Sequence, residues 1–323
     1  MPPDTQPDPT PEPELEATDS IPPRTGYVAL VGRPNAGKST LLNRLVGQHL
    51  SIVTAKAQTT WQRVTGLLTL EDPPAQLIFL DTPGLLDARG LLQRSMLGAA
   101  LEALHEADVV LAVLDTGRRP TEQETAPLLA ALEETRAPVH LALNKVDASS
   151  PEQVERWEQW ASDHLPEDAT LHRISAEQGT GTGALQKALV ADLPVGPFLY
   201  PEDDVASDPV RFFVAELVRE TVFEQYDEEI PYCTFCQVEE FREGQEPIYI
   251  QVNVYVERTS QKGILIGAQG RAIRALGKAA RQKIEHFLGE RVYLDLWVKP
   301  LKSWRRNRSH LARLGFRVPE EDA

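Results

Sequence analysis

The sequence predicts an α/β protein of two domains, in which a mostly parallel sheet with helices on both faces precedes a smaller α+β domain. Three observations support this fold class. Apolar runs of buried-strand length recur before residue 175, and a helical segment follows the first of them. A proline- and acid-rich stretch interrupts the chain at 197–208. Beyond it, strand-like segments flank a strongly amphipathic helix. The length of 323 residues also fits two domains.

The first predicted strand and helix enclose a phosphate-binding turn. Residues 27–31 form an apolar run, and 38–46 has helical spacing with its leucines on one side. Between them, G-R-P-N-A-G-K-S-T matches G-x-x-x-x-G-K-[ST], the P-loop. Backbone N–H groups and a helix dipole meet there, which suits anionic phosphate. The predicted nucleotide contacts are Gly32, Arg33, Pro34, Asn35, Ala36, Gly37, Lys38, Ser39 and Thr40.

Several residues of this turn have distinct predicted roles. Gly32 and Gly37 permit the backbone angles that such a loop requires. Lys38 would reach the outer phosphates, and the Ser39 hydroxyl would bind Mg²⁺. The alternative is a chance match in a glycine-rich turn, but the strand before the motif and the helix after it argue against chance.

A second motif indicates the base. The motif N-K-x-D follows the apolar run 139–143 and comprises Asn144, Lys145, Val146 and Asp147. Because an ionised carboxylate only accepts hydrogen bonds, Asp147 would take both the ring and the amino N–H of guanine. Adenine offers no such pair and would be rejected. An isolated N-K-x-D is usually a solvated turn, but after a P-loop and a strand it predicts guanine recognition.

Two shorter motifs complete the set. The first follows the apolar run 76–80 and comprises Asp81, Thr82, Pro83 and Gly84. Asp81 would hold Mg²⁺ through water, and the Gly84 N–H would meet the γ-phosphate. The second follows 170–174 and comprises Ser175 and Ala176, whose backbone would contact the guanine oxygen. Four motifs in this order predict a P-loop GTPase domain, with GTP and GDP as its nucleotides.

These motifs carry a resemblance to a known family. Residues 26–195 resemble a translation-factor-type GTPase domain, and the whole chain resembles the Era family of bacterial ribosome-assembly GTPases. On this resemblance Gln58-Thr59-Thr60 is the first switch, which makes Thr60 a second Mg²⁺ ligand. The family usually has a basic residue next, where this chain has Trp61. We expect the switches at roughly 50–61 and 81–95.

The residue after Gly84 bears on the mechanism. Ras-like enzymes place a glutamine there to orient the attacking water. This chain has Leu85, also a predicted nucleotide contact, which can neither orient water nor accept a proton, so intrinsic hydrolysis should be slow. In related GTPases an asparagine at the position of Asn35 helps to bind K⁺, which makes Asn35 a candidate K⁺ ligand. The alternative is that Asn35 merely caps the loop. The predicted catalytic residues are Lys38, Asn35, Thr60, Asp81 and Gly84.

Composition limits the remaining classes of protein. With 41% hydrophobic residues the chain can fill its cores, yet no apolar run approaches the roughly 20 residues of a membrane span. The N-terminus lacks a signal sequence, so we expect a cytoplasmic location. Residues 1–24 contain eight prolines and six acidic residues, a composition expected to be disordered. Cys233 and Cys236 lack further ligands for a metal cluster and are interpreted as reduced thiols in a strand.

The net charge of −15 is unevenly distributed along the chain. Residues 258–317 hold 15 Lys and Arg against three acidic side chains, a net charge of +12. Residues 1–257 carry a net charge of −24, and the last six residues add −3. A short basic module on an acidic body is typical of a protein that binds a phosphate backbone.

A glycine turn and a basic helix occupy this module. Residues 271–288 have helical spacing, with an apolar face opposite a basic one. Before them lies I-G-x-x-G, the turn with which KH domains clamp a nucleotide backbone. Alone, G-x-x-G is weak evidence, but here a helix at 209–226 and strands near 232–241, 248–257 and 292–298 give the order of a type-II KH domain. The predicted RNA contacts are Lys262, Ile266, Gly267, Ala268, Gln269, Gly270, Arg271, Arg274, Lys278 and Arg281.

The resemblance extends over this region and implies a function. It includes Leu296-Trp297-Val298-Lys299 and a closing helix near 305–314, although the family often has a lysine where this chain has Ala268 and Gln269. By resemblance, the partners are the 3′ end of 16S rRNA and the 30S ribosomal subunit, with no DNA. We expect a monomer. The predicted organisation is a tail at 1–24, a GTPase domain at 25–196, a linker at 197–208, a KH domain at 209–317 and an acidic tail at 318–323.

Two other classes of function stay open on the sequence alone. Leu85 leaves room for an RNA-binding protein whose nucleotide site is only structural. The basic C-terminal module also fits a membrane-associated signalling or cell-cycle GTPase, located partly on the inner membrane face, although the I-G-x-x-G turn does not require that partner. Turnover of GTP would exclude the first class, and vesicle binding stronger than RNA binding would favour the second.

The substitution Asp147→Asn should weaken binding of GTP far more than binding of xanthosine triphosphate, because an amide can donate to the additional oxygen of xanthine. The dissociation constants of both nucleotides would be measured for the wild type and the variant. Equal losses for the two nucleotides would rule out the predicted guanine contact.

Overall fold

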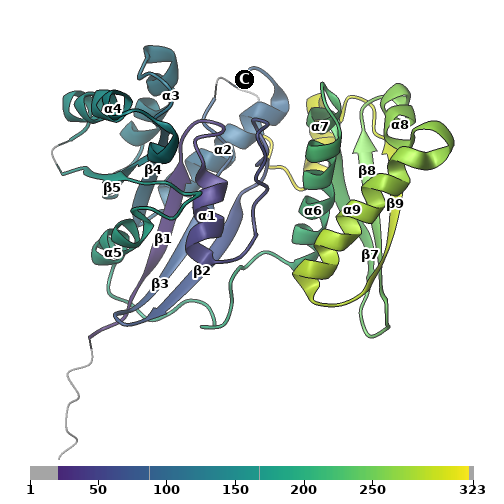
Figure 1. Cartoon of the computed structure of the whole chain (residues 1–323), viewed down its shortest axis with the longest axis horizontal. Helices are drawn as coiled ribbons and strands as arrows, with labels where there is room; N and C mark the ends of the chain where they lie inside the picture. Colours follow the sequence, from purple (N-terminus) through teal and green to yellow (C-terminus); the bar gives the residue numbers. More distant parts are fainter. Residues whose placement is uncertain (1–20, 87, 167, 320–323) are drawn as a thin grey trace, which may run out of the picture.

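The phosphate-binding turn follows β1 in a six-stranded sheet (Figure 1). The computed structural model describes residues 21–86, 88–166 and 168–319, so the predicted tails at 1–24 and 318–323 lie largely outside it. The strand order is β2-β3-β1-β4-β5-β6, with every neighbouring pair parallel except β2 and β3. The strands are β1 (Arg24–Val31), β2 (Val64–Glu71), β3 (Pro74–Asp81), β4 (Val109–Asp115), β5 (Val139–Asn144) and β6 (Thr170–Arg173). The predicted mostly parallel sheet is confirmed.

Helices cover both faces of this sheet. Successive β1 side chains enter opposite cores, with Val28 and Leu30 on one side and Ala29 and Val31 on the other. One face packs against α1 (Lys38–Val46) and α5 (Thr182–Asp192). The opposite face packs against α2 (Leu91–Glu106), α3 (Glu122–Glu133) and α4 (Pro151–His164). A short helical turn, η1 (Val146–Ala148), follows β5.

Within the described residues, every helix is too short or too polar to span a bilayer.

The segment 197–208 is hydrogen-bonded to the six-stranded sheet. The side chain of Gln76, fully buried on β3, accepts the N–H groups of Leu199 and Tyr200 at 2.8 and 3.0 Å. On the neighbouring β2, the Leu67 N–H donates to the Val205 carbonyl at 2.9 Å. These bonds hold the connection between the two domains against the edge strand β2 and its neighbour β3.

The second domain is a three-stranded sheet with helices on one face (Figure 1). Its strands are β7 (Phe235–Arg242), β8 (Ile248–Val256) and β9 (Val292–Pro300). β8 lies between the other two, antiparallel to β7 and parallel to β9. The helices that bury its apolar face are α6 (Val210–Gln225), α8 (Thr259–Ile266) and α9 (Arg271–Leu288). Helix α9 buries Leu276, Ala280 and Ile284, so the predicted helix and its apolar face are confirmed.

Two local predictions in this domain need correction. Cys236 lies in β7, but Cys233 ends the short helix α7 (Ile230–Cys233), where a proline at the helix start favours a turn over a strand. Burial raises the pKa of the Cys233 thiol to about 11. The closing helix at 305–314 is two pieces, η3 (Trp304–Arg306) and α10 (Arg308–Arg313), because the side chain of Asn307 caps the second piece by accepting the His310 N–H.

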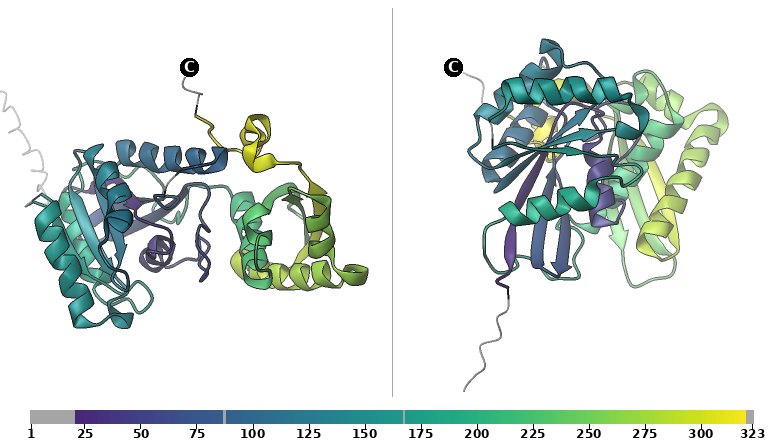
Figure 2. Two further views of the ribbon diagram at one scale, coloured as in Figure 1. Left: turned by 90° about the horizontal axis from the view of Figure 1, so that it is seen from above. Right: turned by 60° about the vertical axis from the view of Figure 1, so that its left-hand side comes forward.

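An aromatic cluster joins the two domains. Trp61 of the first domain is 4% exposed and lies 5.6 Å, centroid to centroid, from the buried ring of Trp304. The chain then returns to α2 through the C-terminal segment 314–318, seen in yellow beside the blue helix in the left view of Figure 2. There the Ser95 hydroxyl donates to the Arg317 carbonyl. The second domain is thus packed directly against Trp61, which lies in the segment expected to form the first switch, and against α2.

Trp304→Ala should destabilise the protein by about 3–5 kcal/mol, because it opens a cavity at a fully buried aromatic side chain. Urea denaturation followed by circular dichroism measures the loss. Trp297→Ala is the matched control, since Trp297 lies in the same domain but is 51% exposed. A Trp304→Ala curve that overlays the Trp297→Ala curve would show that the cluster does not stabilise the fold.

Candidate functional site

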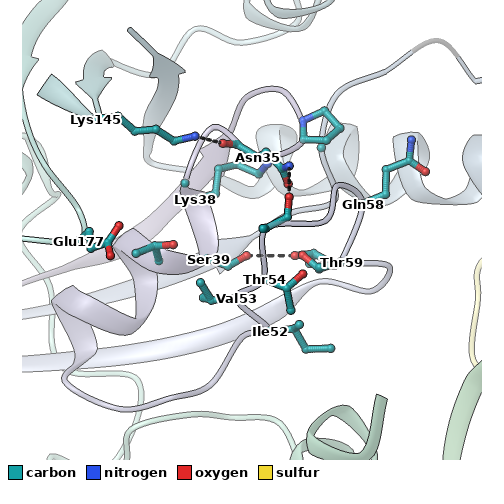
Figure 3. Close-up of a pocket in the computed structure, with 16 residues that line it drawn as sticks. Asn35, Lys38, Ser39, Ile52, Val53, Thr54, Gln58, Thr59, Lys145 and Glu177 are labelled. Carbon is teal, nitrogen blue, oxygen red and sulfur yellow. Dashed lines mark hydrogen bonds between the residues drawn. The ribbon is translucent and has the colours of Figure 1, made fainter. Parts of the chain in front are cut away.

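The carboxyl ends of β1, β3 and β5 bring the predicted nucleotide motifs to one edge of the sheet, the usual location of ligands in this architecture. A cavity of about 600 Å³ lies there (Figure 3). The predicted contacts that line it are Pro34, Asn35, Gly37, Lys38, Ser39, Thr40, Thr60, Gly84 and Lys145. The remaining lining residues are Ile52, Val53, Thr54, Ala55, Gln58, Thr59 and Glu177.

Two glycines allow the loop to approach its neighbours. A Cβ on Gly32, whose φ is 147°, would lie 2.3 Å from the Val113 carbonyl oxygen. A Cβ on Gly37, whose φ is 99°, would lie 2.2 Å from Nδ2 of Asn144. Both contacts are far shorter than atomic radii allow, so no other residue fits at either position without displacing the loop.

The Asn144 side chain connects three of the motifs. Its Nδ2 donates to the Ala36 carbonyl at 2.8 Å, and its Oδ1 accepts the Ala176 N–H at 2.9 Å. The neighbouring Lys145 donates to the Asn35 carbonyl and to Asp115, both at 2.7 Å. Asn144 and Lys145 therefore fix the shape of the P-loop instead of reaching outward, a role that the motif alone did not reveal.

Lys38 and Asp81 are buried charges at the base of the cavity. The Lys38 ammonium donates to the Gly32 and Arg33 carbonyls at 3.2 Å each, and burial lowers its pKa against the opposing effect of Asp81. Burial likewise raises the pKa of Asp81, which is fully buried, while Lys38 and Ser39 oppose the shift. Because burial penalises both charged forms, each group gains from an added partner of opposite charge.

Three oxygen atoms converge where a divalent cation is expected. The Ser39 hydroxyl lies 2.8 Å from Oδ2 of Asp81 and 3.1 Å from the Thr60 hydroxyl. The second carboxylate oxygen of Asp81 is buried without a hydrogen-bond partner. Two hydroxyls and a carboxylate form a hard oxygen donor set, so these residues fit Mg²⁺. Thr60, in the segment expected to form the first switch, thus reaches the P-loop at Ser39.

Three residues that bear on hydrolysis, Asn35, Gly84 and Leu85, lie in or beside the P-loop. Asn35, in the left-handed region at φ 64°, donates from its amide to the Ala55 carbonyl at 3.2 Å, which ties the P-loop to the first switch. Gly84 lies so close to Pro34 that a Cβ would clash with its backbone nitrogen at 2.5 Å. Leu85 is 1% exposed, with its side chain in the core beneath the sheet, so only its backbone lies near the loop.

Other predicted contacts lie apart from the cavity. The Arg33 side chain turns away to pair with Glu124 on α3 at 3.2 Å. Asp147 is exposed, 3.5 Å from the Gln178 amide. The Ala176 N–H donates to the Asn144 side chain. The guanine contact assigned to Ser175 and Ala176 stays a prediction. The cavity residues at 52–55 lie in the segment 50–61 that was expected to form the first switch, although none of them was a predicted contact, and Glu177 directly follows the predicted contact Ala176.

The glycine turn of the second domain has the expected geometry. Gly267 and Gly270 have φ values of 68° and 72°, and a Cβ on Gly267 would lie 2.6 Å from that of Ala272. Between them Gln269 also has a positive φ, and its carbonyl accepts a bond from Arg274 at 2.7 Å. The exposed residues of the predicted RNA-binding set are Ala268, Gln269, Arg271, Arg274, Lys278 and Arg281, whereas Lys262, Ile266, Gly267 and Gly270 are half-buried.

The chain matches known proteins over nearly its whole length. Residues 27–145 match the family model described as 50S ribosome-binding GTPase, and residues 229–305 match the KH domain model. GTPase Era of Carboxydothermus hydrogenoformans is 40% identical over 295 residues, which cover 91% of this chain and 98% of that relative. The chain belongs to the Era family of GTPases. The resemblance drawn from the motifs is thereby confirmed, as is the GTPase activity class.

Two solved Era structures agree in fold. One is a point variant of Aquifex aeolicus Era bound to GDP.AlF4⁻, with 35% identity and a TM-score of 0.86 over 91% of this chain and 100% of that one. The other is Era in complex with MgGDPNP and nucleotides 1506–1542 of 16S ribosomal RNA. It has the same identity and TM-score, over 91% of this chain and 99% of that one.

Asn144→Ala should weaken GTP and GDP binding to the same extent, about tenfold or more, since it frees two buried backbone groups that shape the loop for either nucleotide. Equilibrium binding of fluorescent GTP and GDP analogues measures the effect. Gln153→Ala is the control, because Gln153 also bonds two backbone groups, of Ser150 and Gly117, but outside the cavity. Selective loss of GTP alone would contradict a role in loop shape.

Proposed function

We propose that this protein is a GTP-hydrolysing switch that binds the 3′ region of 16S rRNA and assists assembly of the 30S subunit. The observation that carries the proposal is that the first switch contacts the second domain directly, at Trp61, while Thr60 contacts Ser39. The nucleotide site and the RNA-binding domain are therefore in physical contact. The Era complex with 16S rRNA nucleotides supports the small subunit as target, although one family model is described by the 50S subunit.

In this proposal, GTP is bound and hydrolysed through positioning and charge. Asp147 recognises guanine, Lys38 binds the outer phosphates, and the Gly84 N–H donates to the γ-phosphate. Ser39, Thr60 and Asp81, the last through water, would hold Mg²⁺. When bound, Mg²⁺ neutralises charge that develops on the phosphate oxygens. The site contributes no covalent step, since its catalytic effect comes from fixed charges and donors.

The attacking water lacks a side-chain partner at Leu85, which is in the core. Water positioning is therefore assigned to backbone groups and to a partner of the protein. The Asn35 amide nitrogen donates to the Ala55 carbonyl at 3.2 Å at the rim of the site, and the amide oxygen of Asn35 would be a ligand of K⁺. This ion would provide positive charge where other GTPases use an arginine finger.

The second domain would grip single-stranded RNA at 267–270. The turn leads into the N-terminus of α9, whose dipole and N–H groups favour phosphate. Arg271, Arg274, Lys278 and Arg281 line the exposed side of that helix and add positive charge. Binding of GTP and of RNA would be coupled, and the coupling must be reciprocal. We propose that the protein acts as a cytoplasmic monomer, with GTP hydrolysis releasing it from the subunit.

The test is GTP hydrolysis with and without a single-stranded RNA that copies the 3′ end of 16S rRNA, in potassium and in sodium buffer. The RNA should raise turnover at least several-fold, and a scrambled RNA of equal length should not. Replacing potassium by sodium should lower turnover in the wild type but not in Asn35→Ala.

Turnover that ignores the RNA would contradict the coupled switch, and its complete absence would indicate a structural nucleotide site. Turnover that is equal in both salts would remove K⁺ from the mechanism and leave the remainder intact.

A further inference from the structure

A buried arginine of the second domain reaches into the first switch. Arg219 on α6 is 1% exposed, and its Nη2 donates to the Thr59 carbonyl. Glu216, one turn earlier, pairs with the same guanidinium, and its Oε1 lies 2.8 Å from Nε of Arg219. The third nitrogen, Nη1, is buried without a partner. A cation held in this way at a domain boundary is costly, so a purely structural role would be better served by an apolar side chain.

Trp61, two residues after Thr59, also contacts the second domain. The Arg219 guanidinium lies 4.7 Å from the ring centroid of Trp61, a cation–π contact. The Trp61 ring also packs against two aromatic rings of the second domain: Phe235, stacked at a centroid distance of 6.5 Å, and Trp304. The indole N–H of Trp61 donates to the Gln58 carbonyl at 2.8 Å, which shapes the switch locally.

These two anchors flank Thr60. The Thr59 carbonyl and the Trp61 ring are held in the second domain, while the Thr60 hydroxyl points to Ser39 at 3.1 Å. A main chain fixed on both sides of one residue leaves its side chain little freedom to leave the site. The orientation of the Thr60 hydroxyl therefore depends on contacts made in another domain.

We propose that Arg219, together with Trp61, is a positioning residue for GTP hydrolysis: it holds the first switch in the conformation in which Thr60 binds Mg²⁺. This rests on the proposed function, in which Thr60 is a Mg²⁺ ligand. A movement of α6 relative to the GTPase domain then changes the metal site directly. The same contact explains why Trp61 suits this position, since a basic side chain there would place a second cation against Arg219.

The mechanism makes a selective prediction. A threonine of the first switch contributes to the metal site in the GTP state and is released in the GDP state. Loss of its support should therefore weaken only the GTP-like complex. Arg219→Lys should raise the dissociation constant of the non-hydrolysable analogue GDPNP about tenfold at limiting Mg²⁺, the size expected for one charge-assisted hydrogen bond. Its dissociation constant for GDP should change less than twofold.

Arg211→Lys is the matched control. Arg211 lies on the same helix, stacks over Phe241 at 5.8 Å and donates to the Phe241 carbonyl at 3.3 Å, all within its own domain. It should leave both dissociation constants unchanged. Trp61→Phe should keep the ring contact with Arg219 but lose the bond to Gln58, so its effect should be smaller than that of Trp61→Arg, which should behave like Arg219→Lys.

Hydrogen exchange of the backbone amides at 58–61 gives a second readout in the GDPNP complex, where Arg219→Lys should speed exchange and Arg211→Lys should not. Equal weakening of GDPNP and GDP, or an Arg219→Lys protein indistinguishable from Arg211→Lys, would overturn the inference. The binding measurements require neither turnover nor RNA. A failure of the proposed function in the hydrolysis assay is therefore distinct from a failure here.

Discussion

The geometry of the nucleotide site depends on the pair of hydrogen bonds made by the Asn144 amide. One bond fixes the P-loop at Ala36, and the other fixes the loop that contains Ala176. The lack of a side chain at Gly37 is what allows the amide to lie there. Three loops that are distant in sequence are therefore held together by one buried polar group, for which no apolar residue of similar size could substitute.

Most of the fold could be predicted from the sequence because local signals agree with tertiary ones. The strand before the P-loop, the helix at 38–46 and the amphipathic helix at 271–288 each combine periodicity with glycine signals at their ends. The predictions were less accurate where a single side chain determines the local structure. Asn307 divides the closing helix by capping α10, and Pro231 starts the turn that places Cys233 in a helix.

The sequence predicted which motifs form the candidate site, but not the hydrogen bonds and ion pairs that these motifs make with distant residues. Sequence spacing identifies which residues meet a nucleotide, since each motif has a fixed relation to its own strand. It does not show that Arg33 turns to Glu124, nor that Arg219 of another domain bonds the first switch. Contacts of this kind depend on the packing of surfaces that are far apart in the chain. The periodicity of hydrophobic residues in the sequence does not predict them. Trp61 was visible only as a departure from a family pattern.

The return of the C-terminal segment to α2 constrains how the domains can move. The second domain is joined to the first at its beginning by 197–208, which is bonded to β2 and β3, and at its end by the contact of Arg317 with Ser95. A body held at both ends turns about the line between its attachments more easily than it swings away. A rotation of the second domain between these attachments would change the contacts that Arg219 of α6 makes with Thr59 and Trp61. A rotation about a single axis would suit a two-state signal, because it would make or break these contacts together.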